Sequence, residues 1–219
     1  NPMANHLDLE EQEQLDQLKH FWKQYGNLIT WILIAVLGSV AAWNGYHAWQ
    51  RNQSVQASAM FDEVERVVRS GDVEKTQRAF SEMTERFPRT TYAQLAGLLL
   101  GKMAFDAGKI ESAKAALAWV IENGSDRAYV AIARLRLSGV LIDAMAYDDA
   151  LKTLSAELPD EFVGLVADRK ADIYVLQNKK TEAQAEYLKA FKSLDEASQY
   201  RRLVEVKLNA LGVDTESVK

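Results

Sequence analysis

The side chains best suited to catalysis are absent from most of this chain. All three histidines, His6, His20 and His47, lie within the first fifty residues, and the sequence contains no cysteine. Histidine and cysteine supply most general bases, nucleophiles and transition-metal ligands in proteins. The 169 residues after Gln50 therefore lack the usual Ser/His or Cys/His catalytic pair and most metal-binding constellations.

Carboxylates are abundant, and two adjacent pairs have the composition of an acid and a base. Asp148 with Asp149, and Asp160 with Glu161, stand at expected turns beside helix starts. Acidic residues at such positions usually cap the helix and stabilise its dipole. The sequence also has no phosphate-binding glycine loop and no dinucleotide fingerprint. We therefore expect a non-enzymatic protein with no cofactor and no metal site.

The charge distribution argues against nucleic acid as a ligand. The net charge is −5, of which residues 1–50 carry −3 and the rest of the chain −2. Nucleic-acid-binding proteins present a basic stripe to the phosphates. Here the basic residues form only isolated pairs, such as Lys179 with Lys180, which we expect to be solvated.

One uninterrupted apolar run from Leu28 to Trp49 organises the N-terminal part of the chain. No charged residue occurs between Lys23 and Arg51. The 22 residues of the run span ~33 Å as a helix, enough to cross a hydrocarbon core of ~30 Å. Aromatic rings, which favour the headgroup zone, stand at both ends: Phe21, Trp22 and Tyr25 before it, and Trp43, Tyr46 and Trp49 within its last turns. The sequence predicts a transmembrane anchor over 28–49, preceded by a short acidic tail over 1–27.

A cleavable signal peptide is the main alternative to a retained anchor, because residues 39–41 loosely resemble a cleavage site. However, the preceding segment is long and acidic, and the apolar run continues past that site. Asn1 and Pro2 precede Met3, the expected native start, and are interpreted as an expression remnant.

The orientation of the anchor follows from the basic residues beside it. Lys19 and Lys23 lie close before the run, whereas only Arg51 follows it closely. The flank richer in Lys and Arg usually remains in the cytoplasm. This slight bias predicts a cytoplasmic N-terminus, and the absence of cysteine is compatible with an oxidising compartment for the rest of the chain.

The remainder, residues 50–219, repeats a helical-hairpin pattern. Small residues recur at spacings of 37, 37 and 33 positions: Thr76, Ala113, Ala150 and Ala183. A large apolar residue follows each one four positions later: Phe80, Leu117, Leu154 and Tyr187. Small residues let paired helices approach each other, and the large ones fill the groove between neighbouring hairpins.

Glycines and prolines place the turns of this repeat. Gly71 and Gly108 mark turns within two hairpins, and Pro88 and Pro159 mark boundaries between hairpins. We expect an all-α chain, with the transmembrane helix followed by a tetratricopeptide-like α-solenoid of about four hairpins and a capping helix over 196–211. The alternative is a generic helical bundle with accidental periodicity.

Helix phasing predicts a concave groove lined by the first helix of each hairpin. The expected groove residues are Phe61, Val68, Leu98, Lys102, Phe105, Leu135, Ile142, Leu165 and Val175. This stripe is largely apolar, and Lys102 stands nearly alone as a cation, so a carboxylate-binding groove is not expected. Two occupants remain equally plausible on this pattern: an apolar partner segment, or a terminal helix of the chain itself.

A second stripe of small residues lies within the predicted anchor. Ala35, Gly38, Ala42 and Gly45 share one helix face. Small residues let transmembrane helices pack closely. This face either packs against another transmembrane helix or is tolerated facing lipid.

The layout of tail, single span and divergent repeats resembles a known family. The residues that carry the resemblance are those of the tail: Glu11, Glu13, Leu18, Lys19, Phe21, Trp22, Tyr25, Gly26 and Asn27. The chain resembles the bacterial YfgM-like family, the ancillary subunit of the SecYEG translocon. The resemblance implies an inner-membrane protein with periplasmic repeats, beside the translocon and a membrane-anchored periplasmic chaperone of the prolyl-isomerase-like type.

On this basis we expect an adaptor or chaperone-like factor that links the translocon to that chaperone and to unfolded or emerging polypeptides. A membrane-anchored repeat receptor that reads targeting sequences in the cytosol is one alternative. A scaffold for envelope assembly without affinity for unfolded chains is another.

Overall fold

The computed structural model describes residues 3–218, with side chains from Leu9 onward. The interpretation of Asn1 and Pro2 as an expression remnant lies outside the described residues. Within the described range every regular element is a helix, which confirms the predicted all-α fold. The chain forms two compact units, Asn1–Asn52 and Gln53–Lys219, and each is described by itself.

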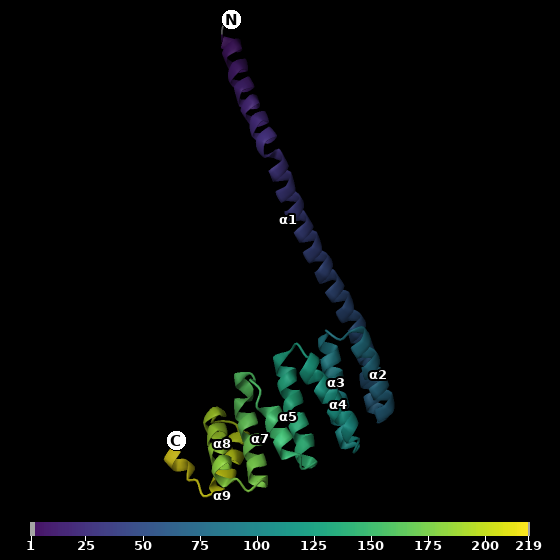
Figure 1. Cartoon of the computed structure of the whole chain (residues 1–219), viewed down its shortest axis with the longest axis vertical. Coiled ribbons are helices and arrows are strands. Elements are labelled where there is room, and N and C mark those ends of the chain that lie inside the picture. The colour runs from purple at the N-terminus through teal and green to yellow at the C-terminus, as the bar shows by residue number, and fades with distance from the viewer. Residues whose placement is uncertain (1–2, 219) are drawn as a thin grey trace. The chain divides into compact units, whose positions relative to one another are not determined.

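The helices follow one another along the chain, and Figure 1 labels most of them. Their bounds are α1 (Met3–Ser70), α2 (Val73–Arg86), α3 (Thr91–Asp106), α4 (Ile110–Asn123), α5 (Arg127–Asp143), α6 (Tyr147–Leu154), η1 (Asp160–Phe162), α7 (Val163–Leu176), α8 (Lys180–Ser193), α9 (Gln199–Ala210) and η2 (Thr215–Val218).

The first unit contains the predicted anchor, which is part of α1. This helix is long and apolar enough to cross a membrane, and only 6% of its most apolar stretch is buried. The side chains of Trp31, Leu37 and Trp43 are all exposed. A core helix of a soluble domain would bury such residues, whereas a helix that crosses a bilayer exposes them to the lipid. The tail before the anchor is helical from Met3 onward.

The second unit consists of four helical hairpins and the terminal helix α9. Residues 53–70 of α1 pair with α2, and the next hairpins are α3 with α4, α5 with α6, and α7 with α8. Each second helix carries the predicted small residue at its fourth position, Thr76, Ala113, Ala150 or Ala183, and all four are fully buried. The large residues four positions later are buried too, so the repeat read from the sequence sets the packing of the hairpins.

The four hairpin turns share one backbone conformation. Gly71, Gly108, Met145 and Asn178 all have φ between 58° and 78°, and each precedes the start of a second helix by two residues. The backbone closes three of these turns in the same way, for example through Lys109 N–H donating to the Ala104 carbonyl at 2.7 Å. This is a left-handed helix end, which glycine adopts readily and most other residues only with strain. The glycine pattern therefore identified two turns, and the other two use Met145 and Asn178.

The terminal helix α9 begins at Gln199 and ends at Ala210, slightly inside the predicted 196–211. Its Val204 and Leu208 are fully buried in a cluster with Tyr187 and Phe191 of α8. These contacts cover the last hairpin as a capping helix does in a helical array.

Both predicted boundary prolines lie between hairpins. Pro88 falls between α2 and α3, and Pro159 falls between α6 and η1.

Candidate partner-binding surfaces

The predicted groove residues lie on the first helices of the hairpins. Phe61 and Val68 lie on α1, Leu98, Lys102 and Phe105 on α3, Leu135 and Ile142 on α5, and Leu165 and Val175 on α7. Six of the apolar ones also belong to, or pack against, core clusters between hairpins: Phe61, Val68, Leu98, Phe105, Leu135 and Ile142. Leu98, 5% exposed, is a core residue, whereas Lys102 and Val175 are exposed. Much of the stripe thus holds neighbouring hairpins together.

Several large apolar side chains on the last helices of the second unit are exposed. In its described part, the large apolar residues with the most exposed side chains are Val55, Met145, Val175, Leu176, Tyr200, Leu203 and Val206. The last five lie on α7 and α9, and we call them the C-terminal apolar surface. Sequence reasoning missed its α9 part because α9 was considered only as a cap. The three-residue spacing of Tyr200, Leu203 and Val206, beside the buried Val204 and Leu208, is the signal that would have revealed it.

An ion cluster joins α7, α8 and α9 next to this surface. Lys207 Nζ lies 2.9 Å from Asp168 Oδ1 and 3.1 Å from Asp172 Oδ1. The Tyr187 hydroxyl donates a hydrogen bond to Asp172. Burial raises the pKa of Asp168, and the hydrogen bond from Lys207 opposes this effect. The cluster fixes α9 against the last hairpin because a buried carboxylate needs its cation.

The geometry of the two helices places apolar residues on both sides of the cluster. Asp168, Asp172 and Val175 share one face of α7, and Leu203 and Lys207 share one face of α9, because they are three or four residues apart. The ion pairs connect these two faces, so Val175 and Leu203 flank the cluster. The arrangement offers a partner exposed apolar contacts around a fixed polar centre.

Two arginines make equivalent contacts between successive hairpins. Arg136 Nη1 donates to the Leu98 carbonyl at 3.0 Å, and Arg169 Nη1 donates to the Leu135 carbonyl at 3.3 Å. A Cβ at Gly139 would lie 3.0 Å from Arg169 Nη1, so the glycine leaves room for this guanidinium. Helix phasing left Lys102 nearly alone as a cation of the groove. The structure brings two guanidinium groups, those of Arg136 and Arg169, to the main-chain carbonyls of two predicted groove residues, Leu98 and Leu135.

The small-residue face of the anchor is open. A Cβ at Gly38 or Gly45 would meet nothing within 4 Å, and the neighbouring Ser39 hydroxyl donates within the helix to the Ala35 carbonyl at 2.7 Å. Ala35 and Ala42 lie on the same face by helix geometry. This face can therefore admit a closely packed helix without leaving a hydroxyl group unsatisfied.

The acidic pairs occupy structural positions. Asp148 and Asp149 lie in the first turn of α6, and Asp160 and Glu161 form part of η1. Among the residues that the structure describes, no group of His, Cys, Asp or Glu side chains is placed to hold a metal ion.

Comparison with known proteins places these features in a family. A family model described as a tetratricopeptide repeat-like domain matches residues 19–213. A protein of Neisseria gonorrhoeae named "Ancillary SecYEG translocon subunit" is 31% identical over 95% of this chain and 100% of its own length. Proteins with the same name from Haemophilus influenzae and Escherichia coli are 28% and 25% identical, each over 93% of this chain and over 98% and 97% of their own lengths.

No solved structure matches the chain. The names of these relatives denote an accessory subunit and no enzyme, in agreement with the prediction of a non-enzymatic protein. Because the family model covers most of the sequence and a relative aligns along its whole length, this chain belongs to the tetratricopeptide repeat-like family of the ancillary SecYEG translocon subunits.

Proposed function

We propose that this chain is an ancillary subunit of the Sec translocon, held in the bacterial inner membrane by α1. One observation carries the proposal: the alignment with the Neisseria gonorrhoeae relative covers 95% of this chain and all of the relative, so it includes both the anchor and the repeats. An accessory subunit needs no catalytic group. It needs one surface for the translocon and another for its partners.

The anchor supplies the first surface. Its open face of Ala35, Gly38, Ala42 and Gly45 suits close packing against a translocon helix, because backbone approach is limited mainly by Cβ atoms. In lipid, such packing is driven by van der Waals contact and not by the hydrophobic effect.

The repeats supply the second surface, in the periplasm. The bias of Lys19 and Lys23 over Arg51 supports a cytoplasmic N-terminus, which sends the C-terminal unit across the membrane. There it would link the translocon to a membrane-anchored prolyl-isomerase-like chaperone and to emerging polypeptides. The exposed C-terminal apolar surface supports this role, since unfolded segments and partner helices both present apolar side chains.

Site-directed crosslinking tests the contact with the translocon. The chain has no cysteine, so a single introduced thiol is unambiguous. Gly38→Cys and Gly45→Cys should crosslink to the translocon in native membranes. Val36→Cys and Val40→Cys, which lie about 200° around the helix from Gly38, are the matched controls. Equal crosslinking from both faces, or none from either, would contradict docking through the small-residue face.

Protease treatment of intact spheroplasts tests the orientation. A periplasmic second unit is digested from outside, whereas a cytosolic receptor remains protected until the membrane is opened. Full protection would overturn the proposed topology and would favour a cytosolic receptor. A scaffold without affinity for unfolded chains would fail to suppress aggregation of an unfolded client.

A further inference from the structure

The part of α1 that precedes the anchor carries a stripe of apolar side chains. Leu15, Leu18, Phe21, Trp22 and Tyr25 fall within an arc of about 120° around the helix, at about 100° per residue. We call these five residues the tail stripe. The side chains of Leu15, Leu18 and Trp22 are each more than half exposed. An apolar stripe of this width on a helix normally faces a protein core or a membrane.

The rest of this segment is polar. His20 and Gln24 lie on the side opposite the tail stripe, and Lys19 and Lys23 lie along one edge of it. Neither lysine forms an ion pair within the part of the chain that the structure describes. A lysine beside an apolar stripe can bury its stem while its ammonium group reaches a polar headgroup. The segment is therefore amphipathic, with two cations at the boundary between its faces.

The tail stripe is continuous with the apolar surface of the anchor. Ile29, inside the anchor, falls within the same arc of the helix. One apolar recess on this side of α1 is lined by residues from both segments: Leu15, Leu18, Lys19, Phe21, Trp22 and Ile29. Because the stripe ends where the anchor begins, an anchored α1 holds it at the membrane surface. A tail that projected straight into water would leave the stripe uncovered.

The junction between tail and anchor has the features that ease a bend in a helix. Gly26 lies there, and glycine weakens a helix interior. The Thr30 hydroxyl donates to the Gly26 carbonyl at 2.7 Å, and a hydroxyl bonded one turn back often bends a helix. Gly26 stands at the edge of the arc of the tail stripe, and a Cβ at this position would lie 3.3 Å from the Trp22 indole. The glycine thus leaves room for α1 to bend toward the side of the stripe.

We propose that residues 15–25 lie along the membrane surface as an interfacial helix. The tail stripe is buried at the boundary between headgroups and acyl chains, and Lys19 and Lys23 contact phospholipid phosphates. This inference rests on the proposed anchoring of the chain by α1, and it adds a second contact with lipid outside the span.

The composition of the stripe favours lipid over a second copy of the chain. The seam of a coiled coil is narrower, with two apolar residues per heptad, and it is built mainly from aliphatic side chains. The tail stripe is wider, and three of its five members are aromatic: Phe21, Trp22 and Tyr25. Aromatic rings favour the headgroup zone of a bilayer.

Nitroxide labels on single introduced cysteines test the inference, since the chain has no cysteine of its own. The full-length protein is reconstituted alone, at high lipid excess, in vesicles of phosphatidylethanolamine and phosphatidylglycerol. Paramagnetic resonance compares the collisions of each label with oxygen, which concentrates in lipid, and with a water-soluble nickel complex. Labels at Leu15→Cys and Leu18→Cys should favour oxygen, whereas labels at His20→Cys and Gln24→Cys should favour nickel.

The comparison of Leu15 with Gln24 is decisive. Gln24 is closer to the anchor along the chain, so a tail that projects from the membrane would hold Leu15 farther from lipid than Gln24. Only a helix that lies on the surface places Leu15 deeper. Leu18→Gln with Trp22→Gln should lower the ratio of oxygen to nickel collisions at Leu15 several-fold. His20→Gln, on the opposite side, is the matched control and should leave this ratio unchanged.

Two results would overturn the inference. One is a label at Leu15 that meets nickel as often as a label at Gln24 does. The other is spin–spin broadening between labels at Leu18 of different copies, which would assign the tail stripe to a second copy of the chain. Extraction of the vesicles with alkaline carbonate separates these outcomes from a failure of the proposed function. A protein that stays in the membrane with its stripe in water lacks only the interfacial helix, whereas release by carbonate would contradict the anchor itself.

Discussion

Lys207 Nζ of α9 lies 2.9 Å from Oδ1 of Asp168 on α7, a carboxylate that is 2% exposed. Two residues 39 positions apart in the sequence thereby fasten the terminal helix to the last hairpin. The same lysine also reaches Asp172, which accepts from Tyr187 of α8. The residues of the C-terminal apolar surface lie on α7 and α9, the two helices that this cluster joins.

Lys207→Met should destabilise the second unit by about 2 kcal/mol. The methionine keeps the apolar stem but leaves the buried Asp168 without its cation, and an unpaired buried charge costs several kcal/mol when fully enclosed. The expected loss of stability is smaller than for a fully enclosed charge, because Lys207 remains partly exposed. Thermal unfolding followed by circular dichroism measures the loss. Lys192→Met, at an exposed position on α8, is the control and should change the free energy of unfolding by less than about 0.5 kcal/mol.

The stability of the second unit should fall as the pH rises above about 10. Burial, followed by the hydrogen bond to Asp172, raises the pKa of Tyr187 above its ordinary value of 10.0. Burial alone would lower the pKa of Lys207, but its hydrogen bonds to Asp168 and Asp172 raise it above 10.5. Both groups hold their protons more tightly when folded. Their contribution is therefore complete below the unfolded pKa and is lost as the pH passes through the folded one.

Urea unfolding at pH 8 and pH 11 measures this dependence. Lys207→Met should remove part of this pH dependence, since one of the two groups with a raised pKa is gone. A variant with the same loss of stability between pH 8 and pH 11 as the unmodified protein would show that the cluster does not cause it.

Ala183→Leu should destabilise the second unit by about 1–3 kcal/mol. Ala183 is fully buried where α8 meets α7, and a larger side chain there must separate the helices. Ala185→Leu is the matched control, because Ala185 lies two residues later on the same helix and is exposed. In thermal unfolding, Ala183→Leu should have a clearly lower melting temperature than Ala185→Leu. Equal melting temperatures would contradict close packing at the repeated small position.

The hairpins could be predicted from the sequence because each repeated residue has a local reason for its type. Thr76, Ala113, Ala150 and Ala183 are small since a partner helix passes close to them, and their spacing survives even where the rest of the repeat diverges. Two turns were missed because Met145 and Asn178 adopt a positive φ that the pattern assigned to glycine.

The surfaces were harder to predict because they depend on contacts between distant helices. Helix phasing predicts that Leu98 and Phe105 line a groove. In the structure Leu98 is almost completely buried, and both residues pack in a cluster that includes residues of the next hairpin. The contact of Arg136 with the Leu98 carbonyl could not be predicted from helix phasing, because only the folded chain brings the two together. Amphipathic periodicity reports which side of a helix is apolar, and not which of several neighbours covers it.

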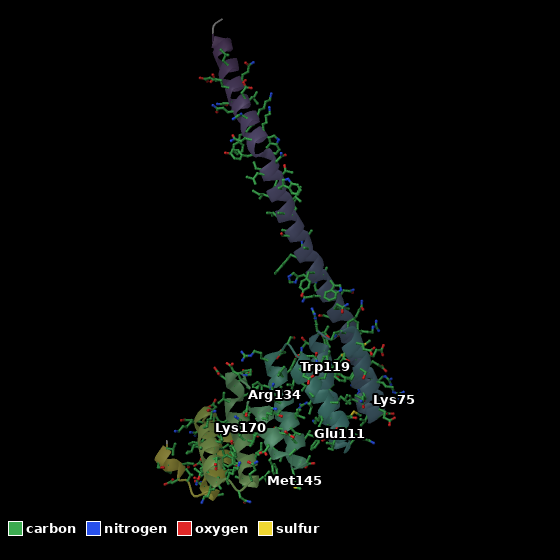
Figure 2. The ribbon with its side chains drawn as sticks, in the orientation of Figure 1. Lys75, Glu111, Trp119, Arg134, Met145 and Lys170 are labelled. Carbon is green, nitrogen blue, oxygen red and sulfur yellow. The ribbon has the colours of Figure 1, made fainter. Side chains whose placement is uncertain are left out.

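Met145→Gly should stabilise the second unit by about 1 kcal/mol, since a side chain at left-handed φ carries a cost of this size. Met145 has φ of 59° and is exposed, so its side chain contributes little packing in return (Figure 2). Gly108→Met, the reverse change at the equivalent turn, should destabilise by a similar amount. Melting temperatures that move in the same direction for both variants would contradict this explanation.

Leu203→Asp combined with Val206→Asp should reduce binding of unfolded polypeptide with little loss of stability. The two side chains are 49% and 63% exposed on α9, so aspartate there removes apolar contact area without burying a charge. Aspartate at Phe105 would be a poorer test, because this side chain packs against two core clusters and its replacement would disturb the hairpins themselves.

Fluorescence anisotropy of a labelled, permanently unfolded polypeptide measures binding to the full-length protein in nonionic detergent. Val55→Asp, at an exposed apolar position on α1, controls for a general effect of added negative charge. A large loss of binding only in the α9 variant would assign the partner site to the C-terminal apolar surface, and equal binding by all three proteins would exclude it.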